Sequence, residues 1–284
     1  MIKFTLKIIC LGLIAVTTYS CSKSDDAIVT PGNSADTSTN FRYPYTINSN
    51  WFFTTTPNYS FYPDSIRRYI SGIDSSVEVG YAVWKNDTVI NGINARVLRT
   101  NHTSSNHAYN TTECYVQTDT GLVNISFTES PSFGPFRPNP NYKFIYNDKQ
   151  YYSIDEFRGK EFSGLLVNID SASAPINCIK YPIVTNTEWY FRKISALQIQ
   201  KKKYLDYVQI QTAAGIYNCI PVQLSNYQGN ARDTNFIQVD YFSKIGMVKR
   251  SRKFKKIAFY YMGNIIGYFD VGEEVVLNSV SIVP

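Results

Sequence analysis

The chain holds few residues whose types and spacing could support catalysis or metal binding. Its two histidines, His102 and His107, lie five residues apart in a polar stretch without a neighbouring cysteine or carboxylate, whereas zinc sites use three or four ligands. Ser/His/Asp or Cys/His catalysis would need one of them as its base. The sequence also lacks the Gly-x-Ser-x-Gly and Gly-x-x-x-x-Gly-Lys motifs. We expect neither a metal site nor a cofactor, and we interpret this stretch as a hairpin loop.

A carboxylate pair for glycoside hydrolysis is harder to exclude, because two acids on distant strands can meet in one cleft. Most of the acids stand at expected turn or surface positions. The candidates are Glu78, Asp119, Asp155, Glu156, Asp240, Glu273 and Glu274. A carbohydrate-active hydrolase therefore stays an alternative function.

The first 20 residues have the order of an export signal. Lys3 and Lys7 precede a charge-free apolar run over 8–16, and small and polar residues follow up to Cys21. The run is too short to span a bilayer. Residues 21–40 are rich in Ser, Thr, Asp and Asn, which predicts a flexible tether, so the folded body begins near Phe41.

Cys21, with the polar and acidic residues 22–26 behind it, resembles the lipid-attachment cysteine of a bacterial lipoprotein. The pattern is similar to outer-membrane lipoproteins of Bacteroidota-type bacteria, in which acidic residues after the cysteine resemble a signal for surface display. Thr18 and Tyr19 stand where such signals usually carry an aliphatic and a small residue. The resemblance implies acylation of Cys21 by chains such as palmitate and an outer-membrane location. Several acyl chains suffice for stable anchoring.

Positive charge is concentrated near the C-terminus, where residues 181–284 hold 13 basic and 7 acidic side chains. One segment carries most of it. Its candidate polyanion contacts are Lys249, Arg250, Arg252, Lys253, Lys255 and Lys256. The alternative is a solvated strand edge, protected by lysines from aggregation. We expect no nucleic-acid partner, because an exported chain rarely meets one and no nucleic-acid-binding module is recognisable.

Three cysteines remain once the signal and Cys21 are set aside. Cys114, Cys178 and Cys219 lie in apolar surroundings, where buried thiols are common. We favour free buried cysteines over a disulfide.

The body is predicted to be all-β. The full chain has 284 residues, 15% of them aromatic, and its body alternates apolar and polar residues in short runs broken by Asn, Gly and Pro. Two short helices are expected, one over 64–71 after Pro63, and one at Ser153–Phe157, where Ser153 and Glu156 have capping-box spacing. The pair Gly263-Asn264 predicts a hairpin turn between strands at 257–262 and 265–269.

Two stretches repeat the same order of features, namely a Trp-led aromatic triplet, a strand, Gly-Ile before a strand, and an aromatic strand that turns into Gly-apolar-Val. We interpret them as a duplicated antiparallel β-meander that forms a curved sheet, half-barrel or sandwich. The matched glycines are Gly92 with Gly215 and Gly121 with Gly246, and the last pair is expected at positive φ. The boundaries are 41–128 for the first repeat, 129–180 for a connection with added β structure, and 181–284 for the second repeat and C-terminal hairpin; 41–284 can also be one globular unit.

The tryptophans divide between core and surface. Trp51 and Trp189 are expected in the core, whereas Trp84, near the turn at Asn86-Asp87, is the candidate for an exposed stacking position. The proline-rich stretch at 129–141 cannot form a central strand. The order of Trp, Gly-Ile, aromatic and Gly-Leu-Val features over 41–284 resembles LolA/LolB-like half-barrel envelope lipoproteins, which implies an incomplete barrel whose concave face holds a lipid or a protein.

These observations favour a non-enzymatic, membrane-anchored envelope lipoprotein that binds an envelope ligand, a glycan, a lipid or a partner protein. A hydrolase and a purely structural envelope component are the alternatives.

Overall fold

The computed structural model describes residues 41–70, 73, 77–103, 108–132, 141–162 and 175–284. Cys21 and the predicted tether lie outside these residues. The described residues form sixteen strands and two short helices. They are β1 Asn50–Tyr62, η1 Asp64–Tyr69, β2 Glu78–Ile90, β3 Ile93–Thr103, β4 Ala108–Gln117, β5 Gly121–Ser132, β6 Tyr142–Tyr146, β7 Lys149–Tyr151, α1 Ile154–Phe162, β8 Ile176–Lys180, β9 Glu188–Lys193, β10 Gln198–Tyr204, β11 Val208–Thr212, β12 Gly215–Gln228, β13 Ala231–Arg232, β14 Phe236–Ser243, β15 Gly246–Tyr261 and β16 Asn264–Ser281.

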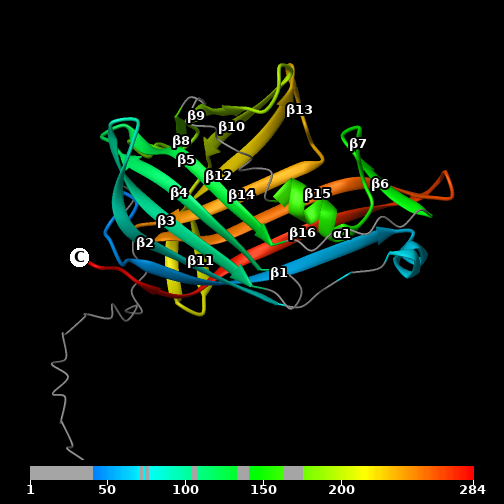
Figure 1. The fold of residues 1–284 in the computed structure, drawn as a ribbon, viewed down its shortest axis with the longest axis horizontal. Coiled ribbons are helices and arrows are strands. Elements are labelled where there is room, and N and C mark those ends of the chain that lie inside the picture. Colours follow the sequence, from blue (N-terminus) through cyan, green and yellow to red (C-terminus); the bar gives the residue numbers. More distant parts are fainter. Residues whose placement is uncertain (1–40, 71–72, 74–76, 104–107, 133–140, 163–174) are drawn as a thin grey trace, which may run out of the picture.

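The strands form one antiparallel sheet that curls into a nearly closed barrel (Figure 1). On one side, β5, β4, β3, β2 and β1 are neighbours in order; on the other, β16, β15, β14, β12, β10 and β9 follow one another. Each side is therefore a meander, and the predicted fold class, all-β with meanders in a curved sheet, is confirmed.

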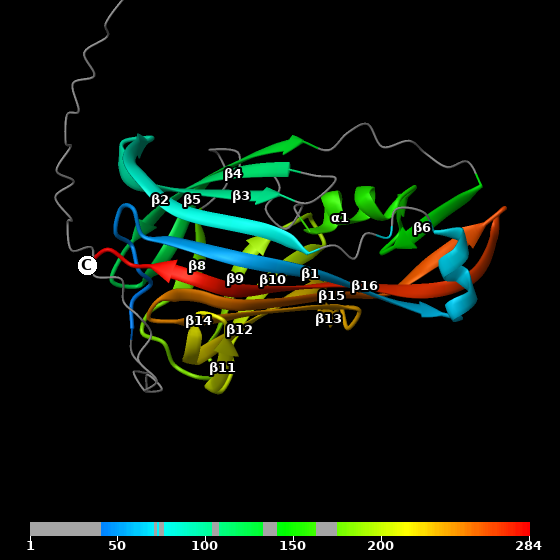
Figure 2. The same ribbon diagram turned by 90° about the horizontal axis from the view of Figure 1, so that it is seen from below.

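The two meanders join where the first and last strands pair. β1 lies antiparallel to β16 from Asn50 opposite Ser281 to Tyr62 opposite Tyr268. Figure 2 shows β1, β16 and β15 running side by side along the whole length of the molecule. The sheet thus continues from one predicted half into the other.

Side chains, rather than a strand ladder, connect the described residues at the two ends of the sheet, β8 and β9–β10. Trp189 Nε1 donates to the Asn177 carbonyl (2.9 Å), and Lys202 Nζ donates to the Cys178 carbonyl (3.0 Å). Tyr204 Oη donates to the Lys180 carbonyl (2.6 Å) and accepts from the Lys180 N–H (3.0 Å). These bonds pair half-buried backbone groups that have no strand ladder in which to pair.

The interior is divided into two apolar clusters. One fills the barrel and contains Trp51, Trp84, Trp189 and Phe242. The other packs α1, β6 and β7 against the far ends of β15 and β16, around Phe144 and Phe259. The core positions predicted for Trp51 and Trp189 are confirmed, at 1% and 7% exposed.

Both expected helices are present, with altered ends. The first is a 3-10 helix whose N-cap is Pro63, which gives no side-chain cap. In α1, the Ser153 hydroxyl accepts from the Glu156 N–H (3.0 Å) as predicted, but the Glu156 carboxylate accepts from the Tyr152 N–H (2.6 Å), one residue earlier than in a capping box.

The glycines predicted at positive φ differ from each other. Gly246 has φ +100°, as expected at the turn into β15. The prediction for Gly121 is wrong, because Gly121 does not have a positive φ. Gly121 is instead required by close approach: a Cβ there would lie 2.4 Å from the Ile179 carbonyl oxygen of β8.

The proline-rich stretch differs from its predicted structure at one end. β5 continues to Ser132 and includes Pro131 opposite Tyr109 of β4, while β8 pairs only with Gly121–Asn124. Beyond Asn124, β5 therefore pairs with β4 alone among the described strands. Pro131 thus lies at an edge of the sheet, where proline is tolerated. Residues 133–140 lie outside the described part of the chain. None of the described helices is long and apolar enough to cross a membrane.

Candidate functional site

The basic segment of the sequence is divided between two faces of β15. Side chains alternate along a strand, so Arg250 and Arg252 face the barrel interior, where both line a cavity. On the outer face, Lys249 lies 2.9 Å from Glu274, and Lys253 lies 3.0 Å from Asp270.

The end of the segment is a bulge. Lys256 has φ +57°, and its N–H donates to Asp270 Oδ1 (3.0 Å), while the register shifts between Phe254 and Ile257. Alternation and the bulge prevent the six cations from forming one surface. Polyanion binding by the outward lysines Lys249, Lys253, Lys255 and Lys256 stays a prediction.

The expectation that Trp84 is exposed is wrong. Trp84 is 0% exposed, its indole N–H donates to the Pro44 carbonyl (2.8 Å), and Tyr45 packs edge-on against it, 4.9 Å between ring centroids. The segment 41–49, which precedes β1, covers it. Trp84 can therefore contact a ligand only from inside the barrel, where it lines the cavity.

Cys114, Cys178 and Cys219 are free thiols as predicted, and Cys114 and Cys219 are also buried as predicted, whereas Cys178 is half-buried. Burial raises the pKa of all three, to about 12 for Cys219, which leaves them protonated and poorly nucleophilic. Within the described residues, no group of three His, Cys, Asp or Glu side chains could hold a metal ion. The side chains of His102 and His107 lie outside the described part.

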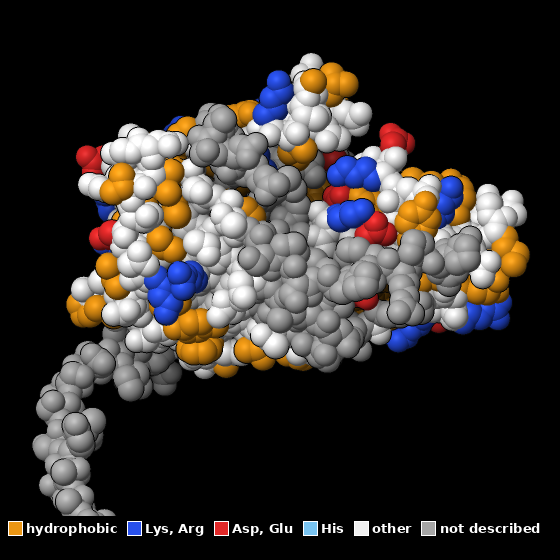
Figure 3. All heavy atoms as spheres, viewed as in Figure 1, with side chains coloured by type: hydrophobic (Ala, Val, Ile, Leu, Met, Phe, Trp, Pro, Cys, Tyr) orange, Lys and Arg blue, Asp and Glu red, His pale blue; other side chains and the backbone are white. Residues whose placement is uncertain are grey.

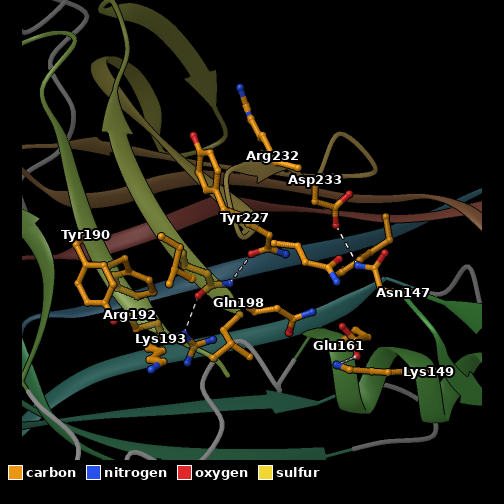
Figure 4. A pocket seen from close by; sticks show the side chains of 18 of the residues that line it. Asn147, Lys149, Glu161, Tyr190, Arg192, Lys193, Gln198, Tyr227, Arg232 and Asp233 are labelled. Carbon is orange, nitrogen blue, oxygen red and sulfur yellow. Dashed lines mark hydrogen bonds and ion pairs between the residues drawn. The ribbon is translucent and has the colours of Figure 1, made fainter. Parts of the chain in front are cut away.

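A groove of about 570 Å³ lies between α1 with the β6–β7 turn on one side and β9, β10 and the β12–β13 hairpin on the other. In Figure 4, Tyr190, Arg192 and Lys193 lie at one end, Asn147, Lys149 and Glu161 at the other, and Tyr227, Arg232 and Asp233 along the hairpin. Lysine and arginine side chains are visible on the hairpin and beside α1 (Figure 3). We name this hollow the polar groove.

Polar groups that suit a hydroxylated ligand line the polar groove. Four amide side chains that are at least partly exposed face it, from Asn147, Gln198, Asn226 and Gln228, and an amide offers both donors and an acceptor. The ring of Tyr190 is 55% exposed and presents a flat apolar face beside them. The groove thus combines a stacking surface with bidirectional hydrogen-bonding groups.

Cations outnumber acids in the polar groove, with Lys149, Lys160, Arg192, Lys193 and Arg232 against Glu161 and Asp233. Lys149 is paired with Glu161 at 3.0 Å, and Lys160 with Glu156 at 2.6 Å. Among the described residues, Lys193 and Arg232 have no carboxylate partner. These two exposed cations give the groove a surplus of positive charge.

The two acids are already engaged by groove residues. Asp233 accepts from Tyr146 Oη (3.2 Å), Asn147 Nδ2 (3.1 Å) and the Asn235 N–H (2.8 Å). Glu161 accepts from Lys149 and from the hydroxyl of Tyr151. Lys149 therefore compensates the charge of Glu161, whereas the donors to Asp233 are neutral and leave its charge in place.

The floor of the groove is held by a buried chain of hydrogen bonds. Arg192 Nε donates to Gln200 Oε1 (2.7 Å), and Gln200 Nε2 donates to Asn226 Oδ1 (2.7 Å). Burial lowers the pKa of Arg192 to about 10, so the guanidinium keeps its charge at neutral pH. A preformed floor reduces the entropy that a ligand must lose to bind.

Sequence reasoning missed the polar groove because most of its residues come from three separated segments, 146–161, 190–200 and 226–233. None of the three carries a recognisable motif. The one usable signal was the aromatic triplet at Trp189–Phe191, whose middle residue, Tyr190, points away from the core.

A scan against protein-family models finds no match, and no curated protein has a similar sequence. Two solved structures are similar. One, from Parabacteroides distasonis, is described as a lipoprotein and has 11% identity and a TM-score of 0.31, over 85% of this chain and 98% of that one. The other, from Bacteroides fragilis, is described as an exported protein with a YmcC-like fold and has 8% identity and a TM-score of 0.34, over 85% and 99%.

Both similar proteins come from Bacteroidota and are described as lipoprotein or exported. The resemblance to LolA/LolB-like lipoproteins stays a prediction.

Proposed function

We propose that this chain is an outer-membrane lipoprotein, anchored through Cys21, that binds an acidic oligosaccharide in the polar groove. The observation that carries the binding role is the composition of the groove, in which an exposed tyrosine ring and four amide groups lie beside two cations that have no carboxylate partner among the described residues. Ring hydroxyls would exchange hydrogen bonds with the amides, and sugar carboxylates would approach Lys193 and Arg232. The hydrolase and structural alternatives have no comparable supporting observation.

Anchoring is tested by intact-mass analysis of the protein expressed in a Bacteroidota host. We expect the membrane fraction to contain a mature chain that starts at Cys21 and carries acyl mass. The variant Cys21→Ala should lose that mass and leave the membrane, since a cysteine thiol is needed for attachment. An unmodified wild-type chain cut elsewhere would contradict the anchor.

Ligand binding is tested on an array of acidic and neutral oligosaccharides matched in length. The probe is the mature chain with Cys21→Ala, which removes any contribution from acyl groups. We expect binding to uronic-acid-containing glycans that weakens as salt rises, because exposed charges are screened. Equal binding to the neutral set, or binding to neither set, would contradict an acidic glycan ligand.

A further inference from the structure

A second hollow lies inside the barrel, lined by residues from both meanders. Its volume is about 220 Å³, room for roughly seven water molecules or one small organic molecule. Apolar rings line part of it, including Trp51, Trp84, Phe53 and Phe242, and a charged cluster lines the rest. We name it the interior cavity.

The three carboxylates of the interior cavity all have partners. Asp240 receives two bonds from Arg250, at 2.6 and 3.1 Å, and Glu273 lies 3.5 Å from Arg252. Glu113 accepts from the Tyr115 hydroxyl, from Thr111 Oγ1 (3.4 Å) and from Asn124 Nδ2 (3.4 Å). Asp240 and Glu273 are therefore paired with cations, whereas Glu113 has only neutral donors, and burial raises its pKa.

Lys202 is the cation that lacks such a partner. It is 6% exposed, and its ammonium group donates one hydrogen bond, to the Cys178 carbonyl (3.0 Å). Its Nζ also lies 4.2 Å from the centroid of the Phe191 ring. Among the described residues, no carboxylate lies within ion-pair distance of Lys202, although an ammonium group has three donors. Burial lowers its pKa, as expected for a cation that is removed from water.

An unpaired hydroxyl lines the same cavity. Thr55 is 2% exposed, and its Oγ1 has no hydrogen-bond partner among the described residues. Buried polar groups without partners are uncommon in native proteins and call for an explanation. The spare donors of Lys202 and the free hydroxyl of Thr55 thus border one space that also has an aromatic wall.

We propose that the interior cavity is a binding site for a small monocarboxylate with an apolar body. The carboxylate accepts hydrogen bonds from Lys202 and Thr55, and the apolar body packs against the rings of Trp51, Trp84 and Phe242. This site is separate from the polar groove, although Phe191 lines both. The assignment does not depend on the glycan proposal.

The test is isothermal titration calorimetry of the mature Cys21→Ala chain with three probes of one shape, 3-phenylpropionate, 3-phenylpropan-1-ol and 3-phenylpropylamine. We expect the acid to bind about tenfold or more tightly than the alcohol, because a charge-assisted hydrogen bond distinguishes them. The amine should not bind. Acid binding should also change the fluorescence of the buried tryptophans.

Substitutions in the interior cavity test whether the acid binds there. Lys202→Met should weaken acid binding by about tenfold or more and leave the alcohol unchanged, whereas the matched control Lys193→Met, in the polar groove, should have no effect. Should Lys202→Met fail to fold, Thr55→Val, which is nearly isosteric, should weaken acid binding several-fold. Equal affinity for acid and alcohol, unchanged acid binding in the folded Lys202→Met or Thr55→Val chain, or no binding of any probe would overturn the proposal.

Discussion

Replacing Gly246 with alanine should destabilise the protein by about 2–4 kcal/mol. Gly246 has φ +100°, a conformation that is strained for any residue with a Cβ. The new methyl group would also lie 2.9 Å from Nε1 of Trp51, whose indole N–H donates to the Ile245 carbonyl. Trp51 is buried in the barrel core, so moving its indole would break that bond and disturb the packing.

The control for this prediction is Gly92→Ala, at the turn between β2 and β3. Gly92 has φ +79°, but no heavy atom lies within 4 Å of the position of its Cβ. This variant should show the strain alone, about 1 kcal/mol. Urea unfolding of both variants gives the comparison; equal losses of stability would show that contact with Trp51 contributes nothing.

Asp240→Asn should cost about 3–5 kcal/mol at pH 7. The change leaves Arg250 without the carboxylate that binds it through two hydrogen bonds, within the interior cavity. Burial acts to raise the pKa of Asp240, but the charge and hydrogen bonds of Arg250 outweigh it, so the pKa lies below its usual value of 3.8. The native state therefore stabilises the ionised form.

The lowered pKa of Asp240 determines how the stability that this carboxylate contributes depends on pH. A carboxylate whose folded pKa is lowered contributes its stability fully above the unfolded pKa, and the contribution is lost as pH falls through the folded pKa. The difference in unfolding free energy between wild type and Asp240→Asn should thus be constant near neutral pH and shrink below about pH 4. Asp119→Asn, at the exposed Arg42 pair, is the control and should change stability little at any pH. A pH-independent difference for Asp240→Asn would contradict the lowered pKa.

Local patterns in the sequence predicted elements well where neighbouring residues determine them. The C-terminal hairpin forms as expected, although its turn residues are Met262 (φ +47°) and Gly263 (φ +85°), one position earlier than predicted. Asn264 is already the first residue of β16. Two consecutive residues at positive φ are what a tight two-residue hairpin turn requires.

Features that depend on distant contacts could not be predicted in the same way. Trp84 is buried because the segment before β1 covers it, and the need for Gly121 comes from the backbone of β8. The sequence shows that side chains of β15 alternate between two faces. Which of these faces points into the barrel depends on the curvature of the whole sheet. The polar groove depends on three segments that only the closed sheet brings together.

The most direct test of the proposed function measures the affinity of an acidic oligosaccharide, selected on the array, for two pairs of variants. Lys193→Gln with Arg232→Gln removes the unpaired cations of the polar groove, and Lys249→Gln with Lys253→Gln removes the same charge from the outer face of β15. Calorimetry should show a loss of about tenfold for the groove pair, with the β15 pair close to wild type. The reverse result, with binding lost in the β15 pair and kept in the groove pair, would contradict the groove as the binding site and favour polyanion contact at β15.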